Sequence, residues 1–249
     1  MKIVVVGGTG LIGTKLVPVL RSQGHETVAA ARSMGINSLT GEGLAEALEG
    51  ADVIVDVSNS SYLDEAGALE FFEGSTLNLL TYGAAAGVSH HVALSVVGTD
   101  RLAGSEGGYF RAKFAQEELI RESGRPYTIV HSTQFFEFLK NIADAATVSG
   151  LARVSRAQVQ PIAADDVAQA LADIASSAPI GGIAEIAGPD RARLEDIVRA
   201  ALSERNDPRQ VVADPLATYF GNHLDEDELL PGAGATLWPT HFAEWAARA

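Results

Sequence analysis

Two side chains in the middle of the chain have the types and the spacing for proton transfer. Tyr109 and Lys113 are four residues apart, so on a helix they project from the same face. A phenol exchanges a proton near neutral pH only if its ionised form is stabilised, and a lysine one turn away supplies the positive charge for this. The pair predicts acid–base chemistry at a substrate oxygen; the alternative is that Tyr109 merely begins a helix.

A glycine-rich turn near the N-terminus predicts a dinucleotide site. The segment Gly7-Gly8-Thr9-Gly10-Leu11-Ile12-Gly13 follows the apolar run 2–6 and opens a stretch with helical spacing of apolar residues. Glycine permits the tight turn and lets backbone N–H groups approach a pyrophosphate, whose charge is favourable at a helix N-terminus. We expect cofactor contacts from Gly7, Thr9, Gly10, Leu11, Ile12 and Gly13.

The residues after the second predicted strand favour NADP as the cofactor. A site for NAD places an Asp or Glu about 20 residues after the glycines, on the ribose 2′-hydroxyl. This chain instead has Ala30-Ala31-Arg32-Ser33, in which a guanidinium and a hydroxyl can bind a 2′-phosphate. We predict that Arg32 and Ser33 bind NADP; NAD is the alternative cofactor, and simple solvent exposure is the alternative role of Arg32.

Alternating strand and helix patterns predict an α/β fold with a doubly wound parallel sheet. Predicted strands cover 2–6, 26–30, 52–57, 91–95 and 127–131, with a weak one near Ile36, and the longest predicted helices cover 65–86 and 110–122. We expect residues 1–134 to form the dinucleotide-binding core. Residues 135–249 are expected to form a mixed α/β substrate-binding region packed on the same core.

Residues that end or follow two predicted strands, most of them polar, are further candidates for ligand contacts. Val57, Ser58 and Asn59 end one strand, and Ser132 and Thr133 follow another. The carboxyl ends of parallel strands meet at the edge of the sheet where ligands bind. We expect all five to contact the cofactor. In the second region, Phe135, Phe136, Tyr219, Phe220 and Trp238 could line an apolar substrate pocket or pack in the core.

The composition of the chain excludes several kinds of site and argues against several binding partners. The 249-residue chain has no cysteine, which excludes disulfides, thiolate catalysis and cysteine-ligated zinc, and we predict no metal site. Its net charge of −14 disfavours direct binding to nucleic acid. No apolar run is long enough to span a membrane. We expect a cytoplasmic monomer or homodimer that binds a small-molecule substrate.

Several segments together resemble one family. These are GGTGLIG at 7–13, ALSVVG at 93–98, YFRAKFAQEELIRESGRPYTIV at 109–130, STQFFEF at 132–138 and PIAADDVAQAL at 161–171. They are similar to the NmrA-like atypical group of the short-chain dehydrogenase/reductase superfamily, over about residues 1–175. The resemblance implies a Rossmann fold in which Tyr109 transfers a proton, Lys113 also holds the nicotinamide ribose and Ser95 assists.

The chain departs from the superfamily pattern at two positions, so alternatives remain. Extended members carry their catalytic serine a residue or two after the position of Ser95, where this chain has Val96 and Val97, and Thr99 is the other candidate hydroxyl. Gly74 stands where an asparagine is common. The leading hypothesis is an NADP-dependent oxidoreductase acting on a small carbonyl compound, alcohol or quinone. The alternatives are a non-catalytic NADP-binding redox sensor and a nucleotide-sugar epimerase or dehydratase.

Overall fold

The main element of the fold is a seven-stranded sheet in which all neighbouring strands are parallel, in the order β12-β9-β5-β4-β3-β1-β2. The computed structural model describes residues 1–60, 64–104 and 108–248. The strands of this sheet are β1 (Lys2–Val6), β2 (Glu26–Ala30), β3 (Val53–Asp56), β4 (His90–Val96), β5 (Tyr127–Ser132), β9 (Gly182–Ala187) and β12 (Thr236–Leu237). The predicted doubly wound α/β fold is confirmed.

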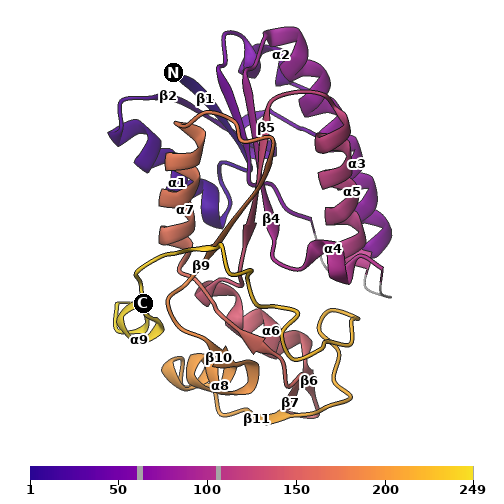
Figure 1. The fold of residues 1–249 in the computed structure, drawn as a ribbon, viewed down its shortest axis with the longest axis vertical. Helices are drawn as coiled ribbons and strands as arrows, with labels where there is room; N and C mark the ends of the chain where they lie inside the picture. The colour runs from indigo at the N-terminus through magenta and orange to yellow at the C-terminus, as the bar shows by residue number, and fades with distance from the viewer. Residues whose placement is uncertain (61–63, 105–107, 249) are drawn as a thin grey trace.

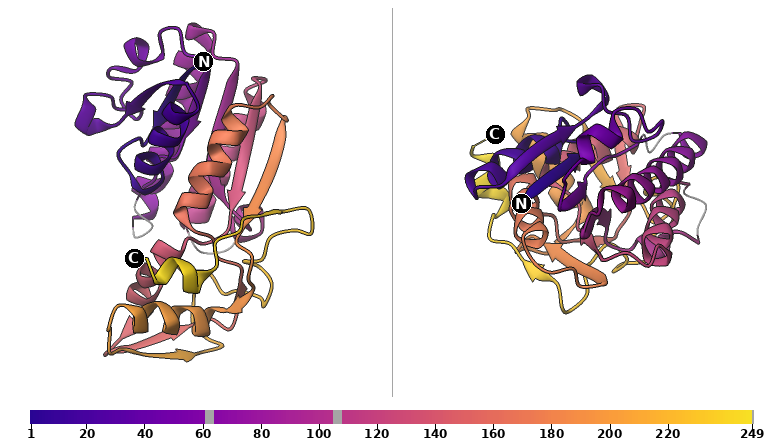
Figure 2. Two further views of the ribbon diagram at one scale, coloured as in Figure 1. Left: turned by 90° about the vertical axis from the view of Figure 1, so that its left-hand side faces the viewer. Right: turned by 90° about the horizontal axis from the view of Figure 1, so that it is seen from above.

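Helices cover both faces of this sheet, as Figures 1 and 2 show. On one face lie α1 (Leu11–Ser22) and α7 (Ala164–Ala175), and on the other lie α2 (Leu44–Leu48), α3 (Glu65–Ala86) and α5 (Gly108–Glu122), with the short α4 (Thr99–Leu102) following β4. Alternate residues of β1 serve the two faces: Ile3 packs with the α1 and α7 side, and Val4 with the α2 and α3 side. Burial on both faces explains why β1 is continuously apolar.

A smaller lobe lies at the end of the main sheet opposite the N-terminus (Figure 1). Its helical elements are η2 (Phe136–Phe138), α6 (Leu139–Ala145), α8 (Leu194–Glu204) and α9 (Phe242–Ala246). Its strands are β6 (Thr147–Val148), β7 (Leu151–Val154) and β11 (Gln210–Ala213), which form one small sheet, and β8 (Gln158–Val159) and β10 (Ala192–Arg193), which form another. The chain crosses between the two parts more than once, because α7, β9 and β12 belong to the main layer.

The strand expected near Ile36 is wrong. Residues after β2 form the 3-10 helix η1 (Arg32–Met34) and then turns, in which Gly35, Gly41 and Gly43 all have positive φ. Such glycines reverse the chain at short intervals and leave no extended run for a strand. Asn78 of α3 fixes this loop, because its Nδ2 donates to the carbonyl oxygens of Ser38 and Leu39 at 2.9 and 2.8 Å.

Candidate functional site

A cavity of about 670 Å³ lies at the carboxyl ends of β1, β3 and β4. The strand order changes direction at β1, because β2 lies on one side of β1 and β3 lies on the other. Open α/β sheets bind ligands at this kind of switch point. Most of the residues predicted to bind a cofactor or to act in catalysis line the cavity: Gly7, Thr9, Gly10, Leu11, Ile12, Arg32, Ser33, Val57, Ser58, Asn59, Ser95, Tyr109 and Lys113. The fold therefore brings together residues from distant parts of the sequence.

The glycine turn is closely packed except at Gly10. Gly7 has a φ of +82°, and a Cβ on Gly8 would approach Ala29 to 2.8 Å. A Cβ on Gly13 would collide with the carbonyl oxygen of Gly7, so only glycine lets α1 start this close to the turn. At Gly10 the nearest atom to an added Cβ would be 3.3 Å away. Gly13 therefore allows the turn to pack closely against α1 and does not line the cavity, whereas Gly10 does.

Arg32 and Ser33 lie at the end of the cavity beside β2. Both residues begin η1 and are exposed. The guanidinium of Arg32 has no hydrogen bond or ion pair with any residue in the described part of the chain, and it lines the cavity. A cationic side chain in this position is available to an anionic ligand. Asn37 and Ser38, which the sequence did not single out, line the same end.

Tyr109 reaches the end of β3 from the first turn of α5. Its hydroxyl donates a hydrogen bond to Oδ1 of Asn59 at 2.9 Å, and both residues line the cavity. The ring of Tyr109 meets the rings of Phe72 and Phe110 edge to face, with centroids 6.0 and 5.8 Å apart. These contacts fix the ring and leave its hydroxyl at the cavity surface.

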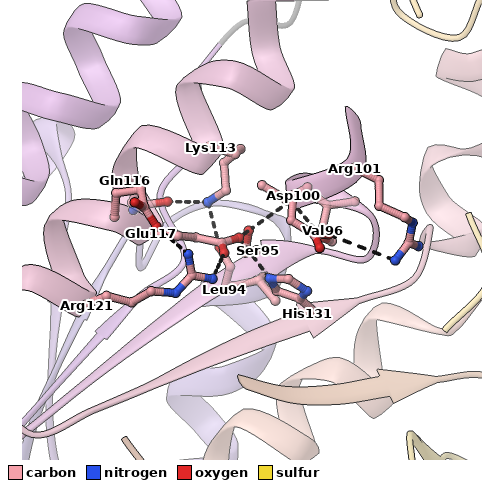
Figure 3. Close-up of polar contacts among 12 residues, drawn as sticks. Leu94, Ser95, Val96, Asp100, Arg101, Lys113, Gln116, Glu117, Arg121 and His131 are labelled. Carbon is pink, nitrogen blue, oxygen red and sulfur yellow. Dashed lines mark hydrogen bonds and ion pairs between the residues drawn. The ribbon is translucent and has the colours of Figure 1, made fainter. Parts of the chain in front are cut away.

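Lys113 lines the cavity one turn further along α5, as the spacing predicted. Its Nζ donates to the carbonyl oxygen of Leu94 at 2.8 Å and to Oε1 of Gln116 (Figure 3), and lies 4.6 Å from the centroid of the Phe72 ring. An ammonium has three N–H donors. Two of them have acceptors among the described residues, so the third is available to a ligand.

A buried chain of hydrogen bonds joins Lys113 to the end of β3. Gln116 Nε2 donates to Oδ2 of Asp56 at 2.9 Å, and Oδ1 of Asp56 accepts from the hydroxyl of Ser58 at 2.6 Å. Burial lowers the pKa of Lys113 to about 8, although the carboxylates of Asp56 and Glu117 act in the opposite direction. The side-chain amide of Gln116 thus lies between the Lys113 ammonium and the Asp56 carboxylate, and it forms a hydrogen bond with each of them.

Ser95 lines the cavity, but its hydroxyl is engaged in a second buried network. It donates to Oε1 of Glu117 at 2.5 Å, and the same carboxylate accepts from His131 Nε2 at 2.9 Å and from Arg121 at 2.7 Å (Figure 3). Burial alone would raise the pKa of Glu117, but the hydrogen bonds from His131 and Ser95 outweigh it and hold the pKa below its ordinary value. Thr99, the alternative hydroxyl, is fully buried and donates to a backbone carbonyl.

Ser132 and Thr133 lie behind the residues that line the cavity. Each is 1% exposed, and the Ser132 hydroxyl donates to the carbonyl oxygen of Thr133 at 3.0 Å. Neither belongs to the lining. The neighbouring residue Phe135 does line the cavity, as do Phe138 and Asn141 of the smaller lobe.

The other candidate aromatic residues divide between the core and a second cavity. Phe136 is 2% exposed and packs on Trp245, and Trp238 packs against the core beneath α1 and α7. Tyr219 and Phe220 line a separate cavity in the smaller lobe. Among the residues that line the main cavity, Phe71 of α3 was missed, because one aromatic residue on an apolar helix carries no signal of its own.

The donors around the main cavity fit a dinucleotide. The N-terminus of α1 begins at the cavity, and its cap residue Gly10 provides no side-chain hydrogen bond, so the backbone amides there can bind a pyrophosphate. Arg32 lies toward one end of the cavity, and Lys113 and Tyr109 toward the other. The volume is within the range of cofactor sites.

A comparison with protein families identifies the cofactor class. Residues 7–178 match the family model described as NAD(P)H-binding. The chain belongs to this NAD(P)H-binding family. The match includes the glycine turn and α5, and it confirms the expected NmrA-like family.

Curated relatives share only part of their length with this chain. The chain is 28% identical over 153 residues to the photosystem II assembly factor Ycf39 of Cyanophora paradoxa, a match that covers 56% of this chain and 47% of that protein. The Synechocystis protein of the same name is 26% identical over 153 residues. The chain thus spans about half the length of the relatives it matches.

Solved structures of the same fold include nucleotide-sugar enzymes. The chain is similar to DesIV, the dTDP-glucose 4,6-dehydratase of Streptomyces venezuelae, with a TM-score of 0.70 and 19% identity over 99% of this chain and 95% of that one. A dTDP-4-dehydrorhamnose reductase from Clostridium acetobutylicum gives a TM-score of 0.67 with 13% identity, over 86% and 84% of the two chains. At these identities the similarity establishes the fold.

Within residues 1–60, 64–104 and 108–248, no helix combines the length and the apolar character that a membrane span requires.

Proposed function

We propose that this protein is an NADP-dependent oxidoreductase that interconverts a small carbonyl compound, such as an aldehyde, ketone or quinone, and its alcohol. The observation that carries the proposal is that Tyr109 and Lys113 line the same cavity as the glycine turn, with the Tyr109 hydroxyl at its surface. A bound nicotinamide supplies a carbon that gives or accepts hydride. The residues of the chain then have to bind the cofactor and move one proton.

The cofactor is assigned to residues along the length of the cavity. The turn at Gly10 and the start of α1 bind the pyrophosphate, and Arg32 with Ser33 binds the 2′-phosphate that distinguishes NADP from NAD. The third N–H of Lys113 binds the nicotinamide ribose. Because the rest of the Lys113 ammonium is fixed by Leu94 and Gln116, this donor is oriented before the cofactor arrives.

Tyr109 is assigned the proton transfer. During carbonyl reduction its hydroxyl turns from Oδ1 of Asn59 to the substrate oxygen and gives that oxygen a proton, and the Lys113 charge lowers the cost of the phenolate that remains. Ser95 is not assigned this role, because its hydroxyl is 3% exposed and donates to the buried Glu117 carboxylate, whereas the hydrogen bond between Tyr109 and Asn59 is exposed. The amide of Asn59, already in contact with the Tyr109 hydroxyl, supplies the N–H donors that the serine does not.

The test is NADPH oxidation by the purified protein across a panel of aldehydes, ketones and quinones. We expect turnover with at least one class. The variant Tyr109→Phe keeps the aromatic contacts and removes the hydroxyl, so it should lose at least about a hundredfold in kcat while NADPH binding is unchanged. If no carbonyl compound oxidises NADPH, or if Tyr109→Phe is as active as the unaltered protein, the proposal is wrong.

The engagement of Ser95 with Glu117 favours one alternative, a protein that binds NADP without catalysis and acts through a partner. The curated relatives named as photosystem II assembly factors point in the same direction. In that case NADPH and NADP⁺ would bind with different affinities, no carbonyl compound would oxidise NADPH, and Tyr109→Phe would change neither affinity.

A further inference from the structure

Gln116 lies one turn beyond Lys113 on α5 and is 1% exposed. A side-chain amide is rarely buried to this extent unless its polar atoms have partners. Its Oε1 accepts from the Lys113 ammonium (Figure 3), and its Nε2 donates to Oδ2 of Asp56, which is also 1% exposed. The amide therefore joins a buried cation to a buried carboxylate.

The chemistry of these two partners fixes the direction of the Gln116 amide. An ammonium only donates hydrogen bonds, and a carboxylate only accepts them. The oxygen of the amide therefore has to face Lys113, and its nitrogen has to face Asp56. Without the carboxylate, the amide could turn over and present its N–H groups to the ammonium, where they would find no acceptor.

Asp56 is itself fixed at the end of β3. Its Oδ1 accepts from the backbone N–H and from the hydroxyl of Ser58, at 2.9 and 2.6 Å, while its Oδ2 accepts from Gln116. A backbone N–H cannot become an acceptor, so the atom that faces it has to remain an oxygen. Ser58 and Lys113 both line the cofactor cavity, and Asp56 and Gln116 connect them behind its surface.

These contacts determine the direction and the charge of the Lys113 ammonium. Its Nζ is held by the carbonyl oxygen of Leu94 and by Oε1 of Gln116. A lysine side chain is flexible and its three N–H groups rotate freely, so a second acceptor restricts the direction of the third N–H. The same acceptor stabilises the charged form, whereas burial lowers the pKa of this lysine.

We propose that Gln116 and Asp56 are positioning residues: Asp56 orients the Gln116 amide, and the amide holds the Lys113 ammonium in its charged form with its third N–H toward the cofactor cavity. The proposal rests on the proposed function, because both residues act through the lysine of that site. Neither residue lines the cavity, so neither is assigned a contact with cofactor or substrate.

Other titratable and charged groups lie around this part of the sheet. They come from α5, β3, β4 and β5, and are Tyr109, Glu117, Arg121, Asp56, His91 and His131. The carboxylates of Asp56 and Glu117 raise the pKa of Lys113. Burial lowers the pKa of His91, and hydrogen bonds hold the pKa of Glu117 below its ordinary value, so both keep one charge state above pH 7.

The test measures the charge of Lys113 without a cofactor. Each protein is unfolded by urea from pH 6 to pH 10.5, alone and combined with Lys113→Met. The titrations of other groups cancel within a pair, so the difference in the free energy of unfolding begins to rise at the pKa of the folded lysine. The control is Gln169→Met, because Gln169 also donates to a carboxylate, Asp173, but lies on α7 outside the cavity lining.

Three variants alter the proposed positioning residues. Gln116→Met removes the acceptor, so the rise should begin about one pH unit or more lower, as expected for the loss of a hydrogen bond to a charged group. Asp56→Asn should shift it in the same direction, because the new amide can satisfy Ser58 or Gln116 but not both, and the carboxylate charge is lost. Gln116→Glu keeps an oxygen acceptor and should cause no downward shift. Gln169→Met should cause none either.

A purely structural role of the amide predicts a different pattern. Gln116→Met would then lower stability by the same amount at every pH, and Gln116→Glu, which buries a carboxylate beside Asp56, would be the more damaging change. A rise that begins at the same pH in Gln116→Met and in the unaltered protein overturns the proposal, as does an equal downward shift in Gln116→Glu. If Gln116→Met does not fold, an unshifted rise in Asp56→Asn overturns it.

Turnover provides the second measurement, and the two proposals fail in different ways. The alkaline decline of kcat in NADPH oxidation should shift with the same variants. If the stability profiles shift as expected but no carbonyl compound oxidises NADPH, the positioning of Lys113 is supported and the oxidoreductase is wrong. If NADPH is oxidised and all variants share one stability profile, the positioning residues are wrong and the oxidoreductase remains.

Discussion

The buried ammonium of Lys113 predicts a specific dependence of stability on pH. Burial lowers the pKa of Lys113 from 10.5 to about 8. Between these two pH values the unfolded chain holds a proton that the folded protein has lost, so the free energy of unfolding increases as pH rises through this window. Below pH 8 the folded protein carries the full cost of the buried charge.

The size of the effect follows from the two pKa values. A fall in pKa from 10.5 to about 8 corresponds to about 3 kcal/mol. Lys113→Met keeps an apolar stem of similar length and removes the ammonium. It leaves the acceptors on Leu94 and Gln116 unpaired at every pH. The free energy of unfolding of the unaltered protein, minus that of Lys113→Met, should therefore increase by about 3 kcal/mol between pH 7 and pH 10.5.

Urea unfolding followed by circular dichroism measures this difference, because other titrating groups contribute equally to both proteins. A difference that is the same at both pH values would refute the reasoning and show that the Lys113 ammonium is not destabilised by burial. The same titration affects the proposed catalysis. Lys113 supports Tyr109 only while it is charged, so carbonyl reduction should decline as pH rises through about 8.

Four further substitutions test separate parts of the site. Arg32→Ala should weaken NADPH binding by about tenfold or more and leave NADH binding unchanged, while the exposed control Arg125→Ala alters neither; equal losses for both cofactors would contradict the 2′-phosphate contact. Gly13→Ala should lower the melting temperature, because its Cβ collides with backbone, whereas Gly10→Ala should fold normally and bind NADPH more weakly; equal melting temperatures would argue against this packing. Ser95→Ala should retain kcat within about threefold, and a loss of a hundredfold in steady-state assays would make its hydroxyl catalytic after all.

Much of the site could be predicted because its residues belong to local patterns. The glycine turn, the boundaries of α3 and the single face shared by Tyr109 and Lys113 depend on spacing within one element. Residues at the carboxyl ends of parallel strands meet at one edge by the geometry of the fold, which explains why Asn59 was found. These features can be predicted without knowledge of tertiary contacts.

The networks that fix the site could not be predicted, because they join elements far apart in the sequence. Gln116 meets Asp56 across 60 positions, and nothing in the sequence of α5 identifies this partner. The engagement of Ser95 with Glu117 is similarly hidden, since a glutamate on a helix is ordinarily exposed. The strand expected near Ile36 failed because three glycines with positive φ outweighed a short apolar pattern.

The most direct test of the proposed oxidoreductase follows the hydride itself. NADPH labelled with deuterium at C4 of the nicotinamide is incubated with the protein and the carbonyl compound that gives the fastest turnover, and the alcohol is examined by mass spectrometry. We expect deuterium on the former carbonyl carbon, and at least about a hundredfold slower labelling with Tyr109→Phe. Tight binding of labelled NADPH with no deuterium in any product would contradict it.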